Sequence, residues 1–363
     1  MKVIMTGGGT GGHIYPAIAI AEKIKEKRPE AEILFVGTKK GLEKDLVPQN
    51  GYPIKFITVS GFNRKNMIKN VKVVKDLLKG NREAKKIIKE FNPDVVIGTG
   101  GYVCGPVVRA AHKMGVKTFI HEQNAFPGMT NKMLEKYVEK VFISFADAEK
   151  YFKNKEKLIL SGNPVRKAFF QADKFYSRKL IGEPDDNFIL LCFGGSQGAG
   201  KINDVMIDVA ESLNGVKNVS LYFVTGSAYY ERILEKIENQ GIHEGNIHVK
   251  KYITNMQDYL SAADLVICRS GALTVSEITV CGKASILIPS PNVTGNHQYH
   301  NAKAVADKGG AIIVEEKDLS SEALLKIISH LKANPQKLRE MELASGKTAP
   351  CDATKIIYEH LGI

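Results

Sequence analysis

A glycine-rich segment followed directly by a histidine lies near the start of the chain. Residues 7–12 have the spacing GxGxxG, and the next residue is His13. Where a strand passes through such a turn into a helix, the first N–H groups of the helix can hold a phosphate. Imidazole titrates near neutral pH, so His13 at the helix start suits a general base. A purely structural histidine is the alternative.

The second predicted strand argues against a nicotinamide cofactor. A dinucleotide site needs an Asp or Glu at the end of this strand to hold the ribose hydroxyls. Here the strand ends in residues 35–39 (FVGTK), which contain no acid. An NAD-dependent oxidoreductase is therefore disfavoured.

Two turns in the second half of the chain could hold a nucleoside diphosphate. Residues 194–199 follow a predicted strand and contain the hydroxyl of Ser196, and segment 269–277 follows another strand, with its helix starting at Ala272. Free N–H groups at a helix start favour diphosphate, and the Glu277 carboxylate can accept both ribose hydroxyls. Structural tight turns are the alternative interpretation.

Alternating strands and helices must carry these candidate sites. Unbroken apolar runs, typical of buried parallel strands, occur at residues 2–6, 32–36, 94–97, 117–121, 140–144, 187–193, 220–225, 247–250, 264–268, 284–289 and 311–314. Helical periodicity follows the glycine turns, and the strand–turn–helix pattern restarts near residue 187. We therefore predict an α/β protein with two doubly wound domains facing a cleft.

The expected domain boundary lies in the turn-rich residues 161–164 (SGNP). It gives an N-terminal domain of residues 1–163, a C-terminal domain of residues 164–340 and a helical C-terminal segment of residues 341–363. The polar residues 171–187 could form part of a linker. The last helix, near residues 352–360, could pack back on the N-terminal domain or on the other half.

The positive charge is concentrated in the first half. Residues 1–163 hold 29 Lys and Arg against 16 Asp and Glu, a net charge of +13, which leaves 22 against 23 for the rest, a net charge of −1. Such asymmetry indicates a polyanionic partner: a membrane leaflet, a pyrophosphate-bearing substrate or a nucleic acid. Residues 64–89 are rich in Lys and Arg but contain no aromatic residue, which disfavours a nucleic-acid-binding module. A solvated basic helix is the alternative.

Targeting and redox features are sparse. No apolar run approaches the ~18–20 residues of a membrane-spanning helix, and the first strand leads directly into a glycine loop, so we expect no signal peptide. The five cysteines are scattered without a CxxC pair. This pattern disfavours a zinc site or a disulfide framework and fits a reducing cytoplasm.

Several runs in order along the chain resemble one enzyme family. They are residues 8–13 (GGTGGH), 98–106 (GTGGYVCGP), 121–124 (HEQN), 162–166 (GNPVR), 194–199 (GGSQGA), 269–277 (RSGALTVSE) and 297–298 (HQ). In this order they resemble the MurG family of glycosyltransferases, whose GT-B fold comprises two doubly wound Rossmann-like domains facing a cleft. The resemblance implies transfer of GlcNAc from UDP-GlcNAc to the C4 hydroxyl of MurNAc in undecaprenyl-pyrophosphoryl-MurNAc-pentapeptide (lipid I). The product would be lipid II of peptidoglycan synthesis, formed with inversion and without cofactor or metal.

The resemblance also implies the site residues. Carried over position by position, the donor site comprises Thr10, Gly11, Gly12, Asn124, Arg166, Ser196, Ile253, Ala272, Leu273, Thr274, Val275, Ser276, Glu277 and Gln298. The acceptor site would comprise Gly100, Gly101, Tyr102 and Asn124, with His13 as the base. Ile253 would border uracil, Gln298 would bind the sugar hydroxyls, and Arg166 would compensate the charge of the leaving UDP.

A lipid-linked acceptor implies a peripheral protein at the cytoplasmic face of the cell membrane, in contact with an anionic surface. A helix near residues 66–78 fits this role, with apolar Met67, Ile68, Val71, Val74, Leu77 and Leu78 flanked by Lys65, Lys69, Lys72 and Lys79. Packing of this face on its own domain stays open, and the sequence carries no signal for an oligomeric state. The nearest rival, a UDP-GlcNAc 2-epimerase, shares the architecture and the donor but does not explain the basic first half or the matches at 121–124 and 269–277.

Overall fold

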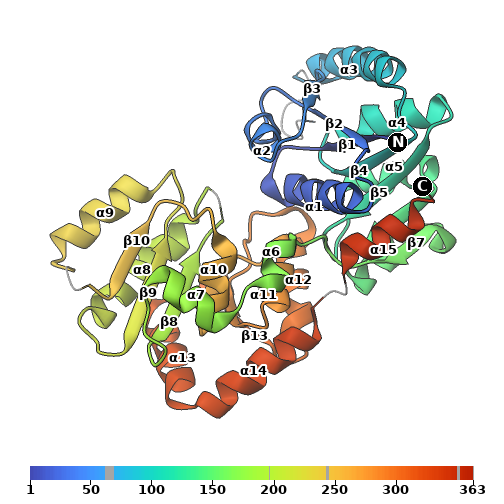
Figure 1. The fold of residues 1–363 in the computed structure, drawn as a ribbon. Coiled ribbons are helices and arrows are strands. Elements are labelled where there is room, and N and C mark those ends of the chain that lie inside the picture. Colours follow the sequence, from blue (N-terminus) through green and yellow to red (C-terminus); the bar gives the residue numbers. More distant parts are fainter. Residues whose placement is uncertain (62–68, 196, 243–244, 350–351, 363) are drawn as a thin grey trace. The chain divides into compact units, whose positions relative to one another are not determined.

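The computed structural model describes residues 1–61, 69–195, 197–242, 245–349 and 352–362, without the side chains of 69–72 and 294. The chain forms two compact units, Met1–Arg166 with Pro350–Ile363 and Lys167–Ala349. Each unit is an α/β domain around a parallel sheet (Figure 1), as the sequence predicts.

The sheet of the first unit has the order β3-β2-β1-β4-β5-β6-β7, and all of its strand pairs are parallel. Its strands are β1 (Lys2–Gly7), β2 (Glu32–Gly37), β3 (Ile54–Phe56), β4 (Val95–Gly100), β5 (Lys117–Glu122), β6 (Lys140–Ile143) and β7 (Leu158–Leu160). Its helices are α1 (Gly11–Lys27), α2 (Glu43–Gln49), α3 (Lys69–Phe91), α4 (Cys104–Lys113), α5 (Met129–Leu134) and α15 (Ala353–His360).

The second sheet has the order β10-β9-β8-β11-β12-β13, again with parallel pairs. Its strands are β8 (Phe188–Phe193), β9 (Val219–Val224), β10 (Ile247–Lys250), β11 (Leu265–Cys268), β12 (Ala284–Leu287) and β13 (Ala311–Ile313). Its helices are α6 (Lys167–Gln171), α7 (Lys174–Ile181), α8 (Gly200–Leu213), α9 (Tyr230–Asn239), α10 (Met256–Ala262), α11 (Ala272–Val280), α12 (His297–Ala306), α13 (Ser321–Ala333) and α14 (Pro335–Lys347).

Both faces of the first sheet are buried, which explains its unbroken apolar strands. Successive side chains of β1 enter different cores, with Val3 and Met5 in the cluster that contains Ile14 and Ile18 of α1, and Ile4 in the cluster that contains α4. Helix α15 packs against α1, and its Ile357 lies fully buried in the α1 cluster. The C-terminal helix therefore belongs to the first unit, the red helix beside α1 in Figure 1.

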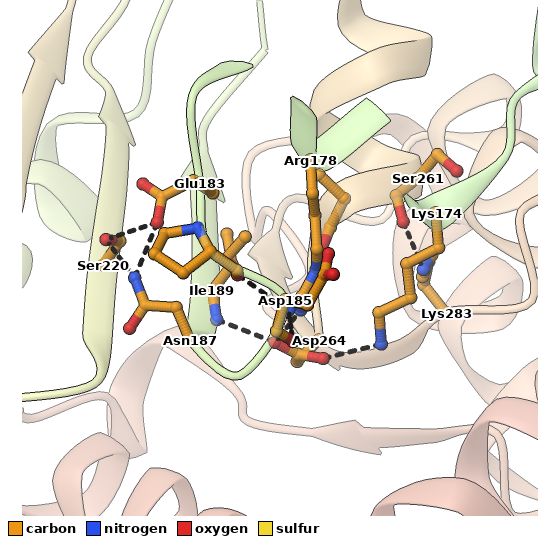
Figure 2. A network of polar contacts seen from close by, with 12 residues as sticks. Lys174, Arg178, Glu183, Asp185, Asn187, Ile189, Ser220, Ser261, Asp264 and Lys283 are labelled. Carbon is orange, nitrogen blue, oxygen red and sulfur yellow. Dashed lines mark hydrogen bonds and ion pairs between the residues drawn. The ribbon is translucent and has the colours of Figure 1, made fainter. Parts of the chain in front are cut away.

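The polar residues 171–187, expected to serve as part of a linker, instead contain α7 of the second unit. Arg178 of α7 is buried and donates to an Asp264 carboxylate oxygen at 2.7 Å, while Lys174 donates to the other oxygen at 2.7 Å. Asp264 also accepts the Ile189 N–H at 2.8 Å (Figure 2). These bonds fix α7 to the start of β8 and to the residue before β11, so the polarity of the segment serves packing.

Candidate functional site

His13 is held at the start of α1 by the glycine loop that follows β1. Its Nδ1 lies 2.9 Å from the Gly8 carbonyl oxygen. A carbonyl only accepts, so Nδ1 carries the proton, and in the neutral ring Nε2 is then an acceptor. Thr10 precedes the helix with extended backbone and makes no side-chain capping bond. This tautomer gives His13 a basic nitrogen at Nε2, as a general base requires.

The turn after β4 packs directly against the His13 ring. Gly100 has a φ of +114°, and a Cβ built on it would lie 2.7 Å from His13 Cδ2. Thr99 Oγ1 donates to the His13 carbonyl at 2.7 Å, and Gly8 N donates to the Gly100 carbonyl at 3.3 Å. The structure thus brings the first and third glycine loops together around the imidazole. Tyr102, two residues further on, is 62% exposed.

Cys104 braces this third loop from inside. The buried Sγ accepts the Gly100 N–H at 3.1 Å and lies 3.0 Å from the carbonyl oxygens of both Thr6 and Gly100, which its S–H can reach as a donor. Burial raises the pKa of the Cys104 thiol to about 12, so it keeps its proton and can act as the donor. The thiol therefore accepts and donates hydrogen bonds as a serine hydroxyl could at this position.

A buried carboxylate, Glu122 at the end of β5, organises the segment of Asn124. One Glu122 oxygen accepts the Asn124 N–H at 3.0 Å and its side-chain amide at 3.2 Å. The other accepts from Gly128 N at 3.0 Å and Asn131 Nδ2 at 2.8 Å. Asn124 is thereby placed by two bonds to the Glu122 carboxylate, which two further bonds tie to Gly128 and Asn131.

A neutral histidine links this segment to the third loop. Burial lowers the pKa of His121 to about 4, so the ring is uncharged at neutral pH. Gln123 Nε2 lies 2.9 Å from His121 Nδ1 and 2.7 Å from the Thr99 carbonyl oxygen. Nδ1 therefore accepts, and Nε2–H donates to the Gly162 carbonyl at 3.0 Å. Thr99 is thus bonded both to His13 and to the Asn124 segment.

Arg166 closes the first unit and lies over an aromatic ring. Its guanidinium carbon is 5.1 Å from the centroid of Tyr15, two residues beyond His13 in α1. This cation–π contact holds a positive charge at the helix whose first turn contains the candidate base. The first unit therefore contains His13, Thr10, Gly11, Gly12, Gly100, Gly101, Tyr102, Asn124 and Arg166.

The remaining predicted residues belong to the second unit. Ser196 lies outside the described residues, but the rest of its loop joins β8 to α8. Gly198 N donates to Gly195 O at 2.9 Å, and a Cβ on Gly198 would come within 2.1 Å of the Thr225 carbonyl oxygen. The loop therefore packs against the end of β9, and a residue with a side chain at position 198 does not fit.

Helix α11 starts at Ala272, as predicted, directly after the turn that follows β11. Gly271 at its N-cap has no side chain, and its first turn has no acid. A helix start of this kind favours a bound anion. Ala272, Val275 and Ser276 are buried, whereas Leu273, Thr274 and Glu277 are partly exposed.

Ile253, Gln298 and Arg269 also belong to the second unit. Ile253 is buried just beyond β10. Gln298 Oε1 accepts the Ser290 N–H at 2.9 Å. Arg269 donates to the carbonyls of Ile288 and Pro289 and pairs with Glu316. Arg269 therefore stabilises the strand ends next to the helix start.

The first unit also contains a cavity of about 710 Å³ that begins at the third loop. Its lining includes Tyr102, Leu77 of α3 and the cations Arg109, Lys132 and Lys136. The cations lie over aromatic rings, with Lys132 Nζ 4.4 Å from the centroid of Phe126 and 5.1 Å from that of Tyr151. The cavity thus joins apolar surface to positive charge.

Among the residues that the structure describes, no group of three or more His, Cys, Asp or Glu side chains is placed to bind a metal ion. None of the described helices is long and apolar enough to span a bilayer.

Sequence reasoning missed several residues that the structure places at the first site. Thr99 lies in the run 98–106 and Glu122 in the run 121–124, so their positions could have marked them as candidates. The hydrogen bonds that they make were not predictable from the sequence. Glu43 carried no such signal. It lies in α2, and its carboxylate bonds the N–H of Gly9 in the first loop at 2.9 Å.

Comparison with known proteins gives a consistent result. Residues 3–143 match the glycosyltransferase family 28 N-terminal domain, and residues 189–356 match the family 28 C-terminal domain. A UDP-N-acetylglucosamine–N-acetylmuramyl-(pentapeptide) pyrophosphoryl-undecaprenol N-acetylglucosamine transferase of Alkaliphilus oremlandii is 48% identical, over 99% of this chain and 98% of that protein. The protein so named in Bacillus thuringiensis subsp. konkukian is 44% identical, with the same coverage.

Solved structures agree. MurG of Acinetobacter baumannii superposes with a TM-score of 0.76 at 28% identity, covering 99% of both chains. UDP-GlcNAc 2-epimerase of Neisseria meningitidis, bound to UDP-GlcNAc, has a TM-score of 0.71 at 12% identity, again covering 99% of both chains. At that identity the second likeness concerns the fold alone.

Proposed function

The chain belongs to the MurG family of glycosyltransferases, in glycosyltransferase family 28, and on this premise we propose that it transfers GlcNAc from UDP-GlcNAc to lipid I, giving lipid II. The acceptor is the C4 hydroxyl of MurNAc in undecaprenyl-pyrophosphoryl-MurNAc-pentapeptide. The observation that carries the proposal is the match, over 99% of this chain, to transferases of this name. The His13 geometry supports the chemistry.

We propose a single displacement with inversion. The lone pair of His13 Nε2 takes the proton of the C4 hydroxyl while this oxygen attacks the anomeric carbon. The bond from that carbon to the UDP oxygen breaks, and UDP leaves with the electron pair as an anion. Support comes from the Nδ1 bond to Gly8, which leaves Nε2 as the basic nitrogen.

We assign the donor's nucleotide to the second unit. The start of α11 and the 194–199 loop would hold the diphosphate, since preorganised N–H groups stabilise the charge of the leaving UDP. Glu277 would accept from the ribose hydroxyls, Ile253 would border uracil, and Gln298 would bind the sugar. The partial exposure of Glu277 and Gln298 supports these roles. Thr10, Gly11, Gly12, Asn124 and Arg166 would complete the donor contacts from the first unit.

We assign the acceptor to the third loop and to Asn124 of the first unit. Gly100 and Gly101 bring backbone close to His13, and Asn124 offers an amide placed by Glu122. The cavity that begins at Tyr102 would take the lipid-proximal part of the acceptor, because its cations suit pyrophosphate and its apolar lining suits a prenyl chain.

We further propose that α3 contacts an anionic membrane surface at the cytoplasmic face. Of the predicted apolar face, Val74, Leu77 and Leu78 are 55%, 43% and 58% exposed. Met67 and Ile68 lie outside the described residues, as does the side chain of Val71. Exposed apolar side chains on a lysine-rich helix are typical of interfacial binding.

Leu78→Glu is expected to lower binding to liposomes rich in anionic lipid by about 10-fold, because the change removes an exposed apolar side chain that would enter the membrane surface and adds a repelled charge. Cosedimentation measures this effect. Leu343→Glu is the matched control, since Leu343 is similarly exposed at 59% on α14 of the other unit. Equal binding to anionic and neutral liposomes, or an equal loss in the control, would contradict the assignment of α3.

The transferase assignment is tested by incubating the protein with labelled UDP-GlcNAc and a lipid I analogue in the presence of EDTA. A labelled disaccharide-lipid is the expected product, and its formation under EDTA would establish that no divalent metal is needed. Formation of UDP-ManNAc without acceptor would instead indicate an epimerase and overturn the acceptor assignment.

A further inference from the structure

Glu43 is a buried acid that bonds the loop preceding the candidate base, and no role above accounts for it. Its side chain is fully buried at the start of α2. One oxygen accepts from Thr38 N at 2.8 Å and from Thr38 Oγ1 at 2.7 Å, and the other accepts from Gly9 N at 2.9 Å. All three partners are donors, which suits a carboxylate with both oxygens accepting.

Three glycines make room for this carboxylate. A Cβ on Gly8, Gly37 or Gly41 would lie 2.5, 2.5 or 1.9 Å from an atom of the Glu43 side chain. These glycines come from the ends of β1 and β2 and from the turn before α2. The backbone of three segments is therefore shaped around one acidic side chain. Because both oxygens are engaged and buried, Glu43 is not a substitute for the ribose-binding acid of a dinucleotide site.

The bond from Glu43 leads to His13 through a single peptide group. The Gly9 N–H that bonds the carboxylate and the Gly8 carbonyl that accepts from His13 Nδ1 belong to the same planar amide. A carboxylate bonded to the N–H of an amide polarises its carbonyl, which strengthens the bond that the carbonyl accepts. The hydrogen bonds thus run from the Glu43 carboxylate through the Gly8–Gly9 amide to the His13 imidazole.

We propose that Glu43 is a positioning residue for the transfer reaction, acting on His13 through the Gly8–Gly9 peptide group. It holds this peptide in the orientation that fixes the Nδ1–H tautomer, and it stabilises the positive charge that the ring acquires on taking the acceptor's proton. The role parallels that of a carboxylate that orients a catalytic histidine directly, except that one amide lies between them. The catalytic part of this inference rests on the proposed function.

The test is Glu43→Gln, which keeps the size of the side chain but loses its charge and places an amide N–H against a backbone or hydroxyl donor. We expect kcat with a soluble lipid I analogue to fall roughly 10- to 100-fold, with the KM for UDP-GlcNAc unchanged. The acidic limb of the pH–kcat profile should move to lower pH. Glu43→Asp, which keeps the charge but shortens the reach, should recover part of the rate.

Glu83→Gln is the matched control. Glu83 makes the same kind of contact, accepting from Thr58 N at 2.5 Å and Thr58 Oγ1 at 3.2 Å, but it has no bond toward His13. A role in folding alone predicts that both variants lose stability and that neither shifts the pH profile. An equal loss of kcat in Glu83→Gln, or an unmoved profile in Glu43→Gln, would overturn the proposal.

Nitrogen-15 NMR of the histidine rings gives a readout that does not depend on activity, and its measurement on the wild-type protein does not require a folded Glu43→Gln variant. The His13 signals are assigned by their absence from His13→Gln. The wild-type protein should show His13 protonated at Nδ1 and not at Nε2, and Glu43→Gln should mix the tautomers. A wild-type ring protonated at Nε2 would overturn the inference even if transfer occurs. If transfer is absent while the wild-type ring keeps the Nδ1–H tautomer and Glu43→Gln still mixes the tautomers, the proposed function is overturned instead.

Discussion

Replacing His13 with alanine is expected to lower kcat for GlcNAc transfer by about 10²–10⁴-fold, the usual contribution of a general base. The proton of the acceptor hydroxyl then has no positioned acceptor, whereas the proposed donor contacts do not include His13. The KM for UDP-GlcNAc should therefore stay within a few-fold of the wild-type value.

Steady-state kinetics with a soluble lipid I analogue measure this effect. His330→Ala is the control, since His330 is exposed on α13 and has no contact with the site residues. A His13→Ala variant that retains full kcat would refute the assignment of the base. A loss confined to KM would mean that His13 binds substrate and moves no proton.

The sequence predicted the architecture because most strands are buried on both faces. Each of the apolar runs identified in the sequence coincides with a strand, to within three residues at either end. Strands β3 and β7 were not predicted. Each is three residues long and lies at an edge of the first sheet. Strand β3 (IKF) is interrupted by a lysine, and β7 (LIL) is apolar but too short for its pattern to indicate a strand.

Helix α3 shows where periodicity was informative and where it was not. The apolar face near residues 66–78 predicted a helix, and α3 continues to Phe91. Its second part, with Ala84, Ile87 and Ile88, packs into the core, whereas Val74, Leu77 and Leu78 are exposed. Spacing alone cannot distinguish these two parts, because both are apolar stripes and only tertiary structure decides which is covered.

The candidate site was predictable in its chemical groups but not in its support. The glycine turns and His13 are local features, and residue type and spacing suffice to find them. The bonds that position His13 join residues far apart in the chain, such as Gly9 to Glu43 and Thr99 to His13. Such pairs depend on which strands are neighbours in the sheet, and the sequence gives no register for them.

Both units contain the same strand–turn–helix unit, but the groups around the turn differ. In the first unit, the Gly9 amide of the loop after β1 already bonds the Glu43 carboxylate, which disfavours a second anion at that amide. In the second unit, the helix start after β11 has no acid in its first turn. A strand–turn–helix unit can thus orient a base in one case and favour a diphosphate in the other, according to whether a buried acid reaches the turn.

Removal of the Asp264 carboxylate is expected to destabilise the second unit by about 3–5 kcal/mol, with the lower end favoured. Asp264→Ala leaves the buried Arg178 guanidinium without its counter-charge and the Ile189 N–H without its acceptor (Figure 2). Arg178 keeps bonds to the carbonyls of Ala262 and Asp185, which limits the loss. The charge of Lys174 matters less, since its side chain is 41% exposed.

Urea unfolding measures this change, with Asp204→Ala as the matched control. Asp204 also pairs with an arginine, Arg232 at 2.9 Å, but both side chains are 47% exposed. An exposed pair of this kind contributes at most about 1 kcal/mol. The bond between Asp264 and Ile189 fixes the beginnings of β11 and β8, and the proposed diphosphate contacts lie at the other ends of these strands. Asp264→Ala should therefore also weaken UDP binding near the unfolding midpoint of the variant. Equal effects of the two substitutions would show that the buried network in Figure 2 does not fix these strands.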